Sequence, residues 1–70
     1  MKKVTLIFSV DKEHGKQMIG VSETVDGAIK LLKKSGYGWD MGEQELAIFA
    51  ILGYTTNREV NFKLETWEVN

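Results

Sequence analysis

The chain has 70 residues, 43% of them hydrophobic, which leaves room for one small domain, 1–70, and none for two. Nine basic residues stand against ten acidic ones, and the net charge of -1 excludes a general attraction to nucleic acid or anionic lipid. Cysteine is absent, which excludes disulfides, zinc–thiolate sites and thiol chemistry. The function must therefore be sought in local features.

Two observations concern membranes and targeting. The longest apolar run, 46–52, is far shorter than a membrane span. The N-terminal residues lead into an alternating pattern, and not into the apolar core of a signal peptide. We expect a soluble, cytoplasmic protein with no membrane contact.

Residues 3–10 alternate between two sets of side chains with period two, which predicts a half-buried strand. One set is the more apolar, and we expect it to face the core. Its members are Val4, Leu6, Phe8 and Val10. The polar stretch 11–16 follows, and its Gly15 supplies the positive φ of a tight turn into a second strand over 17–21. The two strands are predicted to form a hairpin.

A helix is predicted from about Thr24 to Ser35. Either Ser22 or Thr24 provides an N-cap, and Gly36 ends the helix in the left-handed conformation. Its apolar residues recur at the helical spacing i, i+3, i+4 and i+7. They are Val25, Ala28, Ile29 and Leu32. We expect this face to pack against the apolar set of the first strand.

The region after this helix allows two interpretations. Asp40 with Glu43 three residues later resembles a capping box, which favours a second helix from Met41 to Leu52 that ends at Gly53. Because 45–52 is almost entirely apolar, a third strand is the alternative. A final strand over 59–69 places Val60, Phe62 and Leu64 on one side. The expected fold is α+β, a small antiparallel sheet with one or two helices on one face, in the order ββααβ or, alternatively, ββαββ.

Four segments together resemble small accessory proteins of phages and prophages of Gram-positive bacteria. They are the strand Val4–Val10, the segment Ile19-Gly20-Val21, the helix residues Ala28, Ile29 and Leu32, and the final Trp67-Glu68-Val69-Asn70. The resemblance covers about half the chain and implies a role as inhibitor or modulator of a host or defence protein. It implies no catalytic residue.

Residues suited to catalysis are few. His14 lies near Asp11 and Glu13, which are acceptable metal ligands, but all three fall in a predicted solvated turn. Gly36-Tyr37-Gly38 lacks the further glycine or the Gly-Lys-Ser of a phosphate loop. We expect no enzyme activity, no cofactor and no metal.

A basic patch offers a second class of function. Lys30, Lys33 and Lys34 fall on the outer face of the predicted helix, where a nucleic-acid-associated regulator would bind phosphates. Ordinary solvation explains these lysines better, because the chain lacks a run of arginines and an adjoining aromatic stacking platform. Nucleic acid is therefore the less favoured partner.

Four aromatic residues fall outside the expected core: Tyr37, Trp39, Tyr54 and Trp67. Tryptophan and tyrosine are favoured at protein interfaces, although they also close small cores. So small a domain does not fully bury four of them. We therefore predict a non-enzymatic module that binds another protein, with homodimer formation as a further option. If Trp39 is structural, the next candidate is the sheet face around Asn61, Lys63, Glu65 and Trp67.

Overall fold

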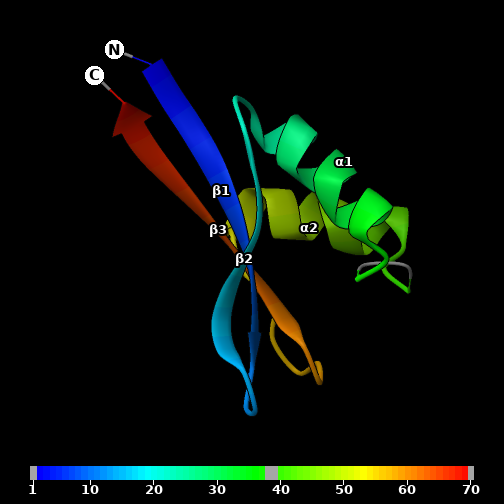
Figure 1. Ribbon diagram of the computed structural model, residues 1–70. Helices are drawn as coiled ribbons and strands as arrows, with labels where there is room; N and C mark the ends of the chain where they lie inside the picture. The colour runs from blue at the N-terminus through cyan, green and yellow to red at the C-terminus, as the bar shows by residue number, and fades with distance from the viewer. Residues whose placement is uncertain (1, 38–39, 70) are drawn as a thin grey trace.

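The computed structural model describes residues 2–37 and 40–69. Its elements are β1 (Lys2–Asp11), β2 (Gly15–Ser22), α1 (Val25–Ser35), α2 (Glu43–Leu52) and β3 (Asn61–Val69). The strands form one antiparallel sheet in the order β2-β1-β3, and both helices lie on the same side of it (Figure 1). The α+β class and the order ββααβ are confirmed, and the alternative ββαββ is wrong because 43–52 is a helix.

The turn and cap residues behave as predicted around α1. Gly15 closes the hairpin with φ 68°, and Gly36 ends the helix with φ 84°. Of the two N-cap candidates, Thr24 takes the role, because its Oγ1 accepts a hydrogen bond of 3.0 Å from the backbone N–H of Gly27. These local interactions fix both ends of α1 without help from the core.

The start of α2 differs from the expectation. The helix begins at Glu43 and not at Met41, because Gly42 is the N-cap. This glycine has no side chain that could accept a capping hydrogen bond. Asp40 does not cap it because its carboxylate binds Arg58 instead. The predicted end is confirmed, since Gly53 has φ 82° and its N–H donates to the carbonyl oxygen of Phe49.

The central strand β1 buries the face opposite to the one expected. Ile7 is 0% exposed, and Thr5 and Ser9 are buried beside it. The predicted core set, Val4, Leu6, Phe8 and Val10, is only half-buried on the other face. The expected packing of α1 against Val4, Leu6 and Phe8 is therefore wrong.

The physical reason lies in the size of neighbouring side chains. On the covered face Ser9 is opposite Phe62 and Ile7 is opposite Leu64. The small serine leaves room for the ring of Phe62, which packs against Phe49 of α2. Ile7 packs in a core that also contains residues of α1, α2 and β3. The other buried hydrophobic residues are Ala28, Leu32, Met41, Leu46, Phe49 and Phe62. Neither helix in residues 2–37 and 40–69 has the length and apolar character needed to cross a membrane.

The face assignment can be tested by truncating one residue on each face of β1 and one buried residue of α1. Ile7→Ala and Leu32→Ala are each expected to lower the free energy of unfolding by about 2–5 kcal/mol, because each leaves a cavity in the core. Leu6→Ala, the matched control on the other face, is expected to cost less because Leu6 is already partly hydrated. Urea denaturation measures all three. A larger loss for Leu6→Ala than for Ile7→Ala would contradict the assignment.

Candidate interaction surface

The face of the sheet turned away from the helices is formed by alternate residues of all three strands. Residues directly opposite each other in an antiparallel pair share a face. The register therefore groups Leu6 with Val21 and Glu65, and Phe8 with Met18 and Lys63. We call this surface the open sheet face. It comprises Val4, Leu6, Phe8, Val10, Lys16, Met18, Val21, Asn61, Lys63, Glu65, Trp67 and Val69.

The open sheet face is rich in apolar groups that reach solvent. Trp67 is 56% exposed and Met18 is 57% exposed, and Val21 and Val69 are each about half-exposed. Scattered apolar residues are normal on a protein surface, but contiguous ones mark an interaction site. Val4 lies opposite Trp67, so the indole lies beside the apolar row of β1, at the end where that row begins.

A group of charges crosses the middle of this face. Lys16 of β2 forms an ion pair with Glu65 of β3, so its side chain spans β1. The ammonium lies 4.3 Å from the centroid of the Phe8 ring, a cation–π contact. Lys63 Nζ lies 3.6 Å from the same carboxylate. The lysine stem thereby covers part of an aromatic ring that no helix covers.

Glu65 also anchors the exposed indole. Trp67 Nε1 donates a 3.1 Å hydrogen bond to Glu65 Oε1. The hydrogen bond from Lys16, followed by the one from Trp67, lowers the pKa of the Glu65 carboxyl from its ordinary value. Both donors bind the ionised form, which is why it is favoured. The carboxylate therefore holds Trp67 in one orientation on the surface.

Tyr54 belongs to the same face. It forms a single antiparallel bridge with Lys63, which places the two residues on one side of the sheet. Leu64 N–H donates to the carbonyl oxygen of Gly53 at 2.7 Å, and Thr55 N–H donates to that of Phe62 at 3.0 Å. These bonds fix the segment after α2 along the outer edge of β3. Two of the four predicted aromatic residues, Tyr54 and Trp67, thus lie on the open sheet face.

The other two predicted aromatic residues do not add to this surface. Tyr37 lies on the helix side, where its ring meets the Phe62 ring at 6.5 Å and 73°. It is nevertheless half-exposed. Trp39 lies outside the described residues, so its predicted role stays a prediction.

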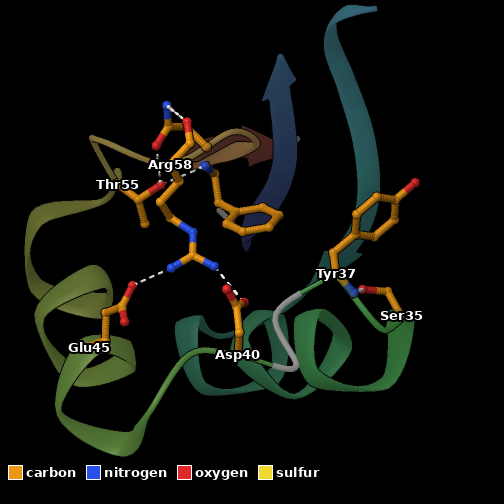
Figure 2. A network of polar contacts seen from close by, with 8 residues as sticks. Ser35, Tyr37, Asp40, Glu45, Thr55 and Arg58 are labelled. Carbon is orange, nitrogen blue, oxygen red and sulfur yellow. Dashed lines mark hydrogen bonds and ion pairs between the residues drawn. The ribbon is translucent and has the colours of Figure 1, made fainter.

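Arg58 organises the segment that carries Tyr54, and sequence reasoning missed it. Its guanidinium binds Asp40 and Glu45 at 2.5 Å each, as Figure 2 shows. It also lies 5.9 Å from the centroid of the Phe62 ring. The side chain is only 17% exposed. The one available signal is that this is the single arginine of the chain, since a planar guanidinium suits a position between two carboxylates.

His14 and the three helix lysines are the other residues singled out in the sequence, and all of them are exposed. His14 is exposed in the hairpin turn, where its backbone N–H donates to Asp11. The turn borders an open hollow of about 880 Å³ that also includes Arg58 and Glu59. Across residues 2–37 and 40–69, no three metal-ligating side chains come together. The helix lysines Lys30, Lys33 and Lys34 are all exposed.

The hydrogen bonds to Glu65 predict a pH dependence. Because the folded pKa of Glu65 lies below the ordinary 4.5, its stabilising contribution is present above pH 4.5 and is lost as the pH falls through the lower folded value. The melting temperature of Glu65→Gln is therefore expected to lie below that of the wild type at neutral pH and to converge with it in acid. In NMR, the Trp67 indole N–H resonance is expected to titrate below pH 4.5. A Trp67 signal that is insensitive to pH would contradict the contact.

Comparison with known proteins adds no relative to this picture. No family model, curated protein or solved structure matches the chain. The candidate surface therefore rests on the residues and geometry described above.

Proposed function

We propose that this chain is a small non-enzymatic module that binds another protein through the open sheet face. The observation that carries the proposal is the uncovered face of β1, whose four apolar side chains continue into the exposed Trp67. Tryptophan anchors within an apolar patch contribute a large share of binding energy at protein interfaces. The hydrogen bond to Glu65 supports this role because it preorganises the indole before binding.

The charges on the open sheet face suggest the chemistry of the partner. Lys16 and Lys63 both approach Glu65, so two positive charges share one negative charge at the centre of the patch. A partner whose apolar surface includes a carboxylate that meets these two lysines complements this arrangement. The Lys16 ammonium lies over the Phe8 ring. An apolar group of the partner that packs on this ring therefore displaces the Lys16 side chain, and this displacement is part of recognition.

The resemblance to phage accessory proteins supplies the biological context of the proposal. In that context the module inhibits or modulates a host or defence protein in the cytoplasm by occluding one of its surfaces. Such a role requires binding to the target protein and no catalytic residue. His14→Gln is accordingly expected to leave the biological effect intact.

The rival function is nucleic-acid binding by Lys30, Lys33 and Lys34, which lie exposed on α1. Salt concentration distinguishes the two functions. A complex held by phosphate contacts loses affinity steeply as salt rises, whereas one held by apolar and aromatic contacts does not. Loss of the effect on Lys33→Glu, with Trp67→Ala unchanged, would favour the rival.

The proposal is tested by quantitative affinity capture from the native host with three baits: wild type, Trp67→Ala and Tyr37→Ala. A specific partner is expected to be retained by wild type and by Tyr37→Ala, the matched aromatic control on the helix side. Trp67→Ala is expected to weaken binding by about 2 kcal/mol, roughly thirtyfold, because it removes the anchor. Titration calorimetry with the identified partner measures this loss.

Stability must be measured on the same variants, because a variant that unfolds also loses binding. Trp67 is exposed, so Trp67→Ala is expected to shift the melting temperature only slightly. Equal affinity of wild type and Trp67→Ala for the captured protein would show that the open sheet face is not the binding site.

A further inference from the structure

The outer edge of β3 is a feature of the sheet that the proposed function does not use. The segment after α2 covers the first part of this edge, where Leu64 N–H donates to the carbonyl oxygen of Gly53. Along a strand, the backbone N–H and C=O groups of successive residues point to opposite sides. Because the register between β1 and β3 has no break, those of Thr66 and Glu68 point to the same outer side as those of Leu64.

The second part of the edge is open. Within residues 2–37 and 40–69, no strand pairs with the outer side of Thr66 and Glu68. Both residues are exposed, as is Trp67 between them, and this end of β3 projects away from both helices (Figure 1). Edge strands are commonly protected by a bulge, a proline or lysines. β2 has a break in its register with β1, but the stretch 65–69 has none of these devices.

We propose that a second copy of this chain pairs with this edge, with the two β3 strands antiparallel and the two Trp67 residues directly opposite each other. In this register Thr66 of each copy lies opposite Glu68 of the other, and the two residues exchange N–H···O=C hydrogen bonds. The twofold axis repeats this exchange on its other side. Both outward donors and both outward acceptors of each copy are then used.

The two neighbouring registers fit less well. A twofold axis at Thr66 brings Glu68 of one copy opposite Leu64 of the other, whose N–H already binds Gly53. An axis at Glu68 places two like charges directly opposite each other, which is destabilising. The axis at Trp67 avoids both problems. It also sets the two indoles side by side on one face, as a pair of the kind that brings side chains closest, and aromatic cross-strand pairs are favourable.

The charges at this edge fit a second copy as well. The two carboxylates of the stretch 65–69 already have neighbours of opposite sign in their own copy, because Glu65 binds Lys16 and Glu68 lies opposite Lys3. The edge therefore requires no basic partner strand. A second copy supplies an uncharged threonine opposite Glu68 and an aromatic ring opposite Trp67, so no like charges face each other.

The pairing joins two three-stranded sheets edge to edge, and it makes the two open sheet faces one continuous surface. Three residues of each copy form the hydrogen-bonded contact, which buries less than the roughly 800 Å² per partner of stable complexes. We expect a weak dimer that exchanges with monomer in the range from about 10 µM to about 1 mM. The pairing needs no other protein, so it does not rest on the proposed function.

Sedimentation equilibrium and amide hydrogen exchange of the full chain test the pairing without any variant. The wild type is expected to shift from monomer toward dimer as its concentration rises. In the monomer the N–H groups of Thr66 and Glu68 face solvent and exchange quickly with deuterium. Their exchange, followed by NMR, is expected to slow in step with the dimer fraction, because both become hydrogen-bonded.

A proline substitution tests the backbone contact directly. Glu68→Pro removes an N–H that points outward, so the hydrogen bonds between β1 and β3 are kept. It is expected to weaken association at least about tenfold, because each copy loses one donor to the other. Glu68→Ala is the matched control, since it removes the same charge but keeps the N–H, and it is expected to associate like the wild type. The melting temperature of both variants shows that they fold.

Several outcomes would overturn the pairing. One is a wild type that stays monomeric at about 1 mM. Another is a dimer in which the Thr66 and Glu68 amides exchange as fast as they do in the monomer, which would place the contact elsewhere. A folded Glu68→Pro that associates like Glu68→Ala is a third. Binding of a captured partner through Trp67 is measured separately, so the proposed function can fail while the pairing holds, and the reverse.

Discussion

The architecture depends on a central strand that has large apolar side chains on both faces in a fold whose helices cover only the less apolar face. β1 lies between β2 and β3, and Ile7 on one face is packed beneath α1 and α2, while Leu6 and Phe8 on the other face remain half-buried. A domain of this size has too little chain to build a second layer. The open sheet face is thus a direct result of placing two helices on one side of the sheet.

Polar side chains compensate for this asymmetry at two places. On the open sheet face, Lys16 reaches across β1 to Glu65 and covers part of the Phe8 ring. On the helix side, Arg58 joins Asp40 to Glu45 and so ties the entrance of α2 to the segment before β3. The first group keeps an apolar surface hydrated at its centre. The second connects residues at the start of α2 to the segment before β3 by ion pairs.

Local signals made the elements predictable, because they act within a few residues. Thr24 and Gly36 at the ends of α1, Gly15 in the hairpin and Gly53 after α2 all take the expected conformations. The buried face of β1 was not predictable from its own residues, because the choice depends on the size of side chains in β3 and the helices. Its more apolar side became the open one, and small Ser9 was buried opposite Phe62.

The candidate surface was predictable only in part for the same reason. Trp67 was expected on the side opposite Phe62 and Leu64, and period two sufficed to place it there. The position of Tyr54 beside Lys63 depends on a bridge between segments that sequence periodicity does not reveal. Arg58 likewise draws its two carboxylates from residues 13 and 18 positions away, so no local pattern identifies them.

The central place of β1 also determines what happens when the sheet opens at its edge. Its segment 4–10 contains no charged residue and no proline, and β-branched and aromatic side chains make it a strong strand former. Segments of this composition nucleate cross-β aggregates when their backbone groups become free. In the closed sheet both of its edges are paired. If β2 frays, the unpaired backbone N–H and C=O groups of this aggregation-prone segment become exposed. The hairpin turn at Gly15 keeps β2 beside β1, so it opposes aggregation as well as shaping the fold.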